Sequence, residues 1–431
     1  MTSSADKMRR PGYAPAANVG VGRRGLHTRD RILVCAAEVF LANGFHGTSL
    51  DTIAKTANAS RATVYQYFAG KEDIFRELSA VAERDVLIHG ERLGGLGPTA
   101  AGITALHDWL VEWADIYDEH AAVFAEFPGI GTPTGLSVID AGTVAETYRL
   151  TVTERLRGAQ LQDLDVDDAA AVLGRIPHMV NLYRHRAMFP LPDRAVVSWS
   201  LTVALQLMLF PDTPAEVLRA TAPARASTRR PSAAVESADA TPELGTSLLS
   251  PSAQDVLAVS SELFAERGYY SVGMEEIAAA ADLSRATLYR HFSTKDKILA
   301  ELTRRAVTEI EEHAVALPRM ASTSLTGWML GYARFHRVYR GVIRAWFDGT
   351  VAEQLSGADV GHGIGAIHRA VERLLDSADL PAGMDGQVAS AVFLAVLGRM
   401  TEPTGAGSPD SDEHAAELMV NLLRRSVLPT A

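Results

Sequence analysis

Apolar residues recur along this chain with the period of an α-helix. The clearest run follows the i, i+3, i+4, i+7, i+8 spacing of a helix that buries one face: Ile32, Cys35, Ala36, Val39 and Phe40. Most of residues 27–218 and 251–431 show the same period, and almost no segment alternates apolar and polar positions as a strand would. The pattern predicts an all-α fold.

Start and stop signals divide residues 27–78 into three helices. Gly44 stands where the first helix is expected to stop. Thr48 and Asp51 form a capping-box pattern at the start of a short second helix, and Ser60 can cap a third helix after a tight turn. Two short helices joined in this way and braced by a longer one form a helix-turn-helix.

The chain carries this unit twice. The segment SRATVYQYF at residues 60–68 returns as SRATLYRHF at residues 284–292, an offset of 224. In the ungapped pairing of residues 38–78 with residues 262–302, 16 of 41 positions are identical, which chance does not produce. Aromatic positions beyond these segments also align at an offset of 219, so whole domains have been duplicated.

Composition supplies the remaining divisions of the chain. Residues 1–26 and 219–250 are rich in Ala, Pro, Ser, Thr and Gly and have little apolar periodicity, which predicts a flexible basic tail and a flexible linker. The predicted domains are two helix-turn-helix domains, each followed by a helical regulatory domain: 27–78, 79–218, 251–302 and 303–431.

Bulk composition narrows the class of protein. The 431 residues fit two domains of about 200 residues each. A formal charge of −11 argues against a generally cationic surface for nucleic acid, although it permits local contact. The single cysteine, Cys35, rules out an internal disulfide, and we find no signal peptide or membrane span. We expect a cytoplasmic protein that is not an enzyme and that uses no cofactor and no metal.

The third helix of each unit presents one apolar and one polar face. Val64 and Phe68 share the inner face, and the small or polar residues Ala62, Thr63 and Gln66 point outward. Tyr65 and Tyr67 are expected to flank that outward face. The second copy keeps Leu288 and Phe292 inside, and it places other residues outside or at the flanks: Ala286, Thr287, Tyr289, Arg290 and His291.

An outward face of this kind suits the DNA major groove. An α-helix fits that groove, where Gln pairs with adenine and Arg with guanine. Lys71 and Lys295 follow the third helices and are placed to hold phosphates, as are the amides near Ser49 at the start of the second helix. A tri-helical unit that only packs or binds protein is the alternative, and neither unit is basic on average.

The combined pattern of Phe40, Gly44, residues 53–54, residues 60–68 and Lys71 resembles the N-terminal DNA-binding domain of the TetR family of transcriptional regulators. The second copy resembles it equally, and the resemblance covers roughly fifty residues of each copy. It implies two tandem TetR-like units, each a helix-turn-helix domain followed by a helical-bundle ligand-binding and dimerisation domain. It also implies DNA-contacting residues at Arg61, Thr63, Tyr65, Gln66, Tyr67, Lys71, Arg285, Thr287, Tyr289, Arg290, His291 and Lys295.

The function that the resemblance implies is a repressor that binds an operator in double-stranded DNA and is released by a small-molecule effector. Late helices near residues 169–183, 196–210, 387–400 and 413–428 would pair the units, within one chain or between two chains. The alternative is a helical sensor or interaction protein in which one or both DNA-binding domains are inactive.

Aromatic residues at helical spacing occur in both regulatory domains. They are Trp109, Trp113, Tyr117 and Phe124 in the first and Trp328, Tyr332, Phe335 and Tyr339 in the second. Two interpretations stay open at this point: packed core, or the lining of an apolar ligand pocket.

Overall fold

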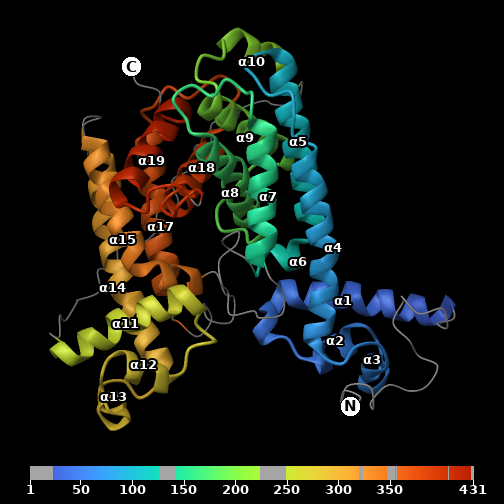
Figure 1. The fold of residues 1–431 in the computed structure, drawn as a ribbon, viewed down its shortest axis with the longest axis vertical. Helices are drawn as coiled ribbons and strands as arrows, with labels where there is room; N and C mark the ends of the chain where they lie inside the picture. The colour runs from blue at the N-terminus through green and yellow to red at the C-terminus, as the bar shows by residue number, and fades with distance from the viewer. Residues whose placement is uncertain are drawn as a thin grey trace.

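Two helical units of similar design lie side by side in the computed structural model of the chain (Figure 1). The structure describes residues 23–126, 141–223, 249–319, 324–346, 355, 357–405 and 407–428. The predicted tail and linker lie almost wholly outside these residues. Every regular element in the described part of the chain is a helix, which confirms the all-α prediction.

Helices of the first unit follow the chain from its helix-turn-helix domain, here called head 1, to the linker. They are α1 Arg23–Gly47, α2 Leu50–Thr56, α3 Arg61–Tyr67, α4 Lys71–Glu91, α5 Ala100–Glu119, α6 Ala121–Phe124, α7 Ala141–Leu156, α8 Val166–His185, α9 Arg194–Leu209 and α10 Ala215–Thr221.

The second unit repeats this order, beginning with the second helix-turn-helix domain, head 2. Its helices are α11 Pro251–Arg267, α12 Met274–Ala280, α13 Arg285–His291, α14 Lys295–Ala316, the 3-10 turn η2 Leu317–Arg319, α15 Leu325–Trp346, α17 Gly357–Leu375, α18 Gly386–Arg399 and α19 Asp412–Ser426. Helices α4 and α14 run without a break from each head into its regulatory domain, so each head is joined to its bundle by a continuous helix.

Local capping fixes where the head helices begin. Ser60 Oγ accepts a hydrogen bond from Thr63 N at 3.0 Å, as predicted for the start of α3. The prediction for α2 was wrong by one residue. Ser49 caps it by accepting from Thr52 N at 3.1 Å, whereas the Thr48 hydroxyl donates to the Gly44 carbonyl at 2.7 Å. Thr48 and Asp51 match the capping-box pattern in sequence. The Thr48 hydroxyl is nevertheless engaged by the Gly44 carbonyl and does not cap α2.

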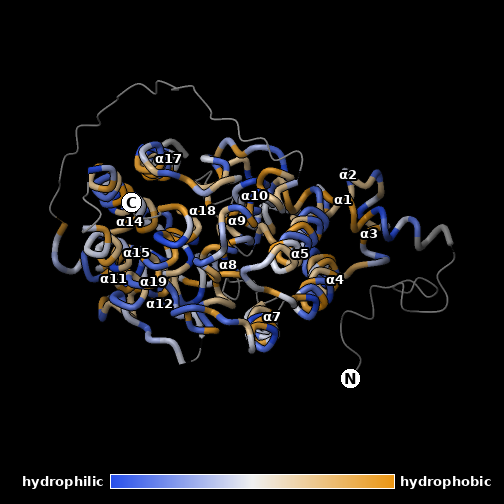
Figure 2. The backbone as a smooth tube through the Cα atoms, turned by 90° about the horizontal axis from the view of Figure 1, so that it is seen from above, coloured by the Kyte–Doolittle hydropathy of each residue, from blue (hydrophilic) through white to orange (hydrophobic). Residues whose placement is uncertain are grey.

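The two units are joined by the late helices that the sequence predicts as a pairing surface. Helix α8 packs against α18, and α9 packs against both α18 and α19. Figure 2, which views the molecule from above, shows α8, α9 and α18 in its middle, between α4 and α5 of one unit and α14 and α15 of the other. The chain therefore forms an intrachain pseudo-dimer.

Burial at this junction is that of a domain core. Every residue of α9 from Val196 to Leu209 is buried. One apolar cluster runs through the regulatory helices of the first unit and through the whole second unit, while head 1 has a separate core that includes Phe40, Ile53 and Phe75. No helix among the described residues is both long enough and apolar enough to cross a bilayer.

Candidate nucleic-acid interface

The third helices of the two heads, α3 and α13, lie at the same end of the molecule (Figure 1). Each follows a tight turn that needs one residue in the left-handed region: Asn58 at φ 47° in head 1 and Asp282 at φ 54° in head 2. Asn and Asp adopt this conformation more readily than most residues. The two turns are therefore the same, and they present α3 and α13 alike.

The inner faces of α3 and α13 are as the sequence predicts. Val64 and Leu288 are fully buried, and Phe68 and Phe292 close the cores beneath them. On the outer side Arg61, Arg285 and Arg290 are exposed. The remaining outward residues are exposed or half-buried: Thr63, Tyr65, Gln66, Thr287, Tyr289 and His291.

Tyr67 is a correction to the sequence-based picture. The pattern of α3 places it beside the outward face, but the side chain is only 4% exposed and belongs to the core of head 1. The reason is helical geometry, because Tyr67 lies three residues after Val64 and positions i and i+3 share a face. The equivalent His291 is half-buried.

Lys71 and Lys295, predicted as phosphate contacts, have an internal role in the structure. Lys71 Nζ donates to the carbonyls of Phe45, His46 and Thr48 at 2.7, 3.3 and 2.9 Å. Lys295 Nζ donates to the carbonyls of Tyr269 and Val272 at 2.7 and 2.9 Å. Burial lowers the pKa of both ammonium groups. Each lysine thus ties α4 or α14 to the turn before the helix-turn-helix.

Replacing Lys71 by methionine is expected to destabilise head 1 by about 2 kcal/mol, since hydrogen bonds to charged groups contribute about 1.5–3 kcal/mol. Thermal unfolding of the variant, with the exposed Lys55→Met as control, measures this loss. The salt dependence of DNA binding separates the two roles. A phosphate contact would reduce the slope of log K against log salt by about 0.9, whereas the carbonyl role leaves the slope of the folded variant unchanged.

Each head holds an arginine of its third helix against an acid of its second helix. Arg61 Nη1 is 3.1 Å from Asp51 Oδ2, and Arg285 Nη1 is 2.5 Å from Glu275 Oε1. More than half of each of these side chains is exposed. Exposed pairs of this kind contribute about 0.2–1 kcal/mol, so a phosphate can displace the carboxylate at little cost.

The two heads touch through equivalent positions. His46 and Tyr270 differ by the repeat offset of 224, and their rings stack with centroids 3.8 Å apart. A contact between equivalent residues places a local two-fold axis between them. The two heads are therefore related by a local pseudo-two-fold axis.

The four aromatic residues of the first unit, for which core packing and pocket lining were both open, are buried against one another and against His89. His89 explains the packing: its ring stacks on Trp109 at 4.3 Å, and Nε2–H donates to the Trp109 carbonyl at 2.9 Å. Tyr117 stacks on Phe124 at 4.6 Å, and Trp113 lies beside both. All four predicted residues are 9% exposed or less.

In the second unit one of the four aromatic residues lines a cavity and the other three do not line it. Trp328, Phe335 and Tyr339 are buried, and the first two pack around the ring of His313. Tyr332 lines a cavity between the two units. The sequence missed the other lining residues because they come from helices of both units.

Three potential metal ligands, Asp85, Glu119 and His120, lie within 4.8 Å of one another in the regulatory part of the first unit. His120 Nε2 is 2.9 Å from Asp85 Oδ2. That pairing accounts for the arrangement of His120 and Asp85 without a metal ion.

Comparison with known proteins supports the duplication. The family model of bacterial regulatory proteins of the tetR family matches residues 32–78 and again residues 256–302. The transcriptional activator FasR of Mycolicibacterium smegmatis is 40% identical over 55 residues, which are 13% of this chain and 25% of FasR. The transcriptional regulator QacR of Staphylococcus aureus is 33% identical over 58 residues, or 14% and 31% of the two chains.

A solved structure of the TetR-family regulator PfmR from Thermus thermophilus aligns with a TM-score of 0.32 and 22% identity, covering 40% of this chain and 98% of that one. The chain spans about a quarter to a third of the length of the curated relatives it matches.

Two like heads on one pseudo-symmetric chain, each with an exposed third helix, define a tandem helix-turn-helix protein. The matches at residues 32–78 and 256–302 show that each head is a DNA-binding domain of the TetR family of transcriptional regulators, and that the chain carries two of them in tandem.

Proposed function

We propose that this protein binds an operator in double-stranded DNA through both heads of one chain and represses transcription until a small-molecule effector releases it. The observation that carries the proposal is the placement of α3 and α13 at one end of the molecule, with equivalent residues of the heads in contact. Paired recognition helices read half-sites about 34–36 Å apart in successive major grooves. The intrachain pairing of α8 and α9 with α18 and α19 supplies what two separate chains supply in a homodimer.

The two heads read different bases in this proposal. Gln66 of head 1 stands where head 2 has Arg290. Gln suits adenine and Arg suits guanine, and a bidentate pair discriminates by about 1–3 kcal/mol. The preferred operator is therefore an imperfect palindrome.

Arg290→Ala is expected to relax base preference at one position of one half-site, by about 5- to 150-fold, given the 1–3 kcal/mol of a bidentate contact. Mobility shifts against an operator with systematic base substitutions measure the effect. Arg373→Ala, which removes an exposed arginine of α17 outside both heads, is the control. Equal loss of base preference in both half-sites would contradict the proposal that each head contacts its own half-site.

Three further measurements distinguish the proposed function from its alternatives. Native mass spectrometry of the complex distinguishes one chain per operator from two. Binding that shows no salt dependence, or no binding to the DNA upstream of the protein's own coding sequence, would favour a sensor whose heads are inactive. A reporter gene placed behind the operator separates repression from activation.

A further inference from the structure

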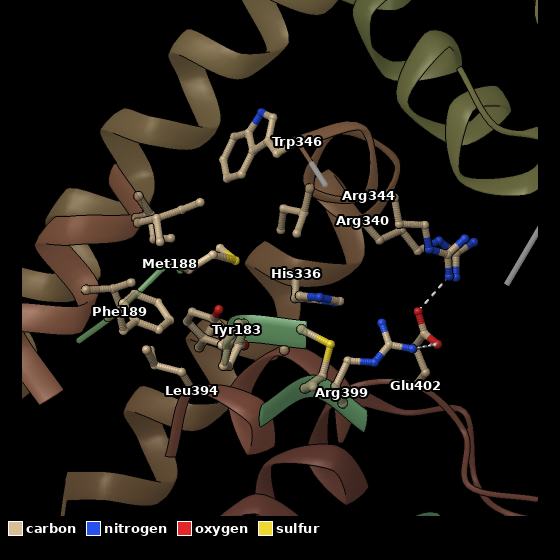
Figure 3. A pocket seen from close by; sticks show the side chains of 17 residues that line it. Tyr183, Met188, Phe189, His336, Arg340, Arg344, Trp346, Leu394, Arg399 and Glu402 are labelled. Carbon is tan, nitrogen blue, oxygen red and sulfur yellow. Dashed lines mark hydrogen bonds and ion pairs between the residues drawn. The ribbon is translucent and has the colours of Figure 1, made fainter. Parts of the chain in front are cut away.

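A cavity of about 80 Å³ lies where the two units meet (Figure 3). Its apolar walls come from both units. Tyr183, Met188 and Phe189 of the first unit face Trp346 and Leu394 of the second. Phe189 also stacks on His368 of α17 with ring centroids 4.3 Å apart, which fixes this wall across the junction.

The other end of the cavity is cationic. Arg340, Arg344 and Arg399 line it, together with the carboxylate of Glu402. Arg344 Nη2 is 2.6 Å from Glu402 Oε1, but Arg399 Nη2 is 3.6 Å from Oε2, which is too far for a hydrogen bond. Among these lining groups the arginines outnumber the carboxylate by three to one.

Arg399 is the unusual member of this group. Its side chain is 7% exposed, and its Nε and Nη2 atoms have no hydrogen-bond partner. Arg344 Nε is also buried without a partner. Burial lowers the pKa of Arg399. Burying a charge without full hydrogen bonding costs free energy. An anion at this end of the cavity would supply the hydrogen-bond acceptors that these arginine nitrogens lack.

Comparison of the two copies explains why Arg399 Nε and Nη2 lack hydrogen-bond partners. Its equivalent in the first unit is Arg175, which donates to three carbonyls beyond the end of α18, those of Arg399, Glu402 and Pro403. Helix α18 stops at Arg399, ahead of Pro403, so these carbonyls are free. Helix α8 continues to His185, and its carbonyls around residues 175–179 are used inside the helix.

The first unit has no counterpart of this charged end. At the repeat offsets, Ala125 stands in place of Arg344 and His178 in place of Glu402. Tyr117 and Phe124 fill the corresponding region, with the Tyr117 ring 5.6 Å from that of His178. Arg344 and Glu402 therefore have no guanidinium or carboxylate equivalent at the matching positions of the first unit.

We propose that this cavity binds a small carboxylate with a short apolar tail, its carboxylate on Arg399 and Arg344 and its tail between the walls of the two units. A cavity needs about 10–15 Å³ of such volume for each water-sized group, so 80 Å³ holds about five to eight non-hydrogen atoms. A monocarboxylate of four to six carbons has this size. His336, at the same end, is kept neutral because burial lowers its pKa to about 4, so it adds no competing charge.

The carboxylate site is connected to head 2 through Arg344. While Nη2 of this arginine holds Glu402, its Nη1 donates to the Ala265 carbonyl near the end of α11 at 2.7 Å. A carboxylate that engages Arg344 competes for the group that ties α15 to head 2. This regulatory step rests on the proposed function, and the carboxylate site itself does not.

Calorimetry on the full chain tests the site without DNA. Butyrate and hexanoate are the probes, and butanamide is the neutral control of the same size. Wild type is expected to bind the carboxylates at least 10-fold more tightly than the amide, and Arg399→Met is expected to remove that preference. Arg373→Met controls for net charge, and Leu394→Trp, which fills the cavity while leaving the arginines in place, is expected to abolish binding.

Carboxylate binding that survives both Arg399→Met and Leu394→Trp would overturn the site, as would equal affinity for butanamide or no carboxylate binding by wild type. Hydrogen exchange of α11–α13 with and without hexanoate tests the connection to head 2 independently of any operator. Increased exchange there, lost in Arg344→Met, is expected. Unchanged exchange with bound hexanoate would overturn the connection, and failure to bind DNA would contradict only the proposed function.

Discussion

Replacing Gly341 by alanine is expected to destabilise the packing of head 2 on its regulatory domain by about 3 kcal/mol, the upper part of the usual cost of overpacking. A Cβ atom at Gly341 would lie 2.5 Å from Ala265 N, 2.7 Å from Ser261 O and 2.9 Å from Phe264 C. These are backbone atoms of α11, so no side chain can turn aside to make room. The backbones of α11 and α15 are in direct contact there.

Neighbouring contacts confirm that this crossing is tight. The Ser261 hydroxyl donates to the Val338 carbonyl at 2.5 Å, one turn before Gly341, and Arg344 reaches the Ala265 carbonyl one turn after it. The three positions on α15 are spaced by three residues and share one face. The close approach is therefore continuous along the helix.

Gly327→Ala is the matched control for this experiment. Gly327 lies on the same helix, and a Cβ atom added to it would have nothing within 4 Å. Alanine stabilises a helix interior by about 1 kcal/mol relative to glycine. Thermal unfolding of the two variants should therefore shift in opposite directions, and Gly341→Ala should also weaken binding to the half-site of head 2. A Gly341→Ala protein as stable as wild type would show that α11 and α15 do not approach as described.

Arg175→Met is expected to lower the free energy of unfolding by about 3 kcal/mol, because hydrogen bonds to charged groups contribute about 1.5–3 kcal/mol each. The change leaves three carbonyls at the end of α18 without their donor. The burial of Arg175 already opposes its charge and lowers its pKa to about 10, which offsets part of this loss. Weakened pairing of the two units should follow.

Arg399→Met, at the equivalent position of the second unit, is expected to lower the free energy of unfolding by less than Arg175→Met does. It removes a buried cation that makes no hydrogen bond through Nε or Nη2, so the interaction lost is the ion pair with Glu402 at 3.6 Å. Urea denaturation of the pair measures the contrast. Equal destabilisation by both substitutions would mean that Arg399 is fully satisfied in the folded protein.

The heads show which features could be predicted from local sequence and which could not. The inner faces of α3 and α13 and the cap at Ser60 were predicted because they depend on neighbours within a few positions. Tyr67 was placed wrongly, although its i+3 relation to Val64 was available in the sequence. Lys71 and Lys295 could not be assigned, because their carbonyl partners lie more than twenty residues away.

The sequence by itself determined the helical fold and the duplication, since these depend on periodicity and on direct identity between the copies. The helices by which the units pair were predicted from the resemblance to the TetR family. Only the tertiary structure decided three further points: which aromatic residues pack as core, that His46 stacks on Tyr270, and that Arg175 donates to three carbonyls while Arg399 Nε and Nη2 make no hydrogen bond. Arg175 and Arg399 lie in the same local sequence but differ in their hydrogen bonds. Arg175 meets the C-terminal carbonyls of α18, whereas α8 continues past the equivalent position. That difference arises from the lengths of α8 and α18 on opposite sides of the junction, and no local pattern records it.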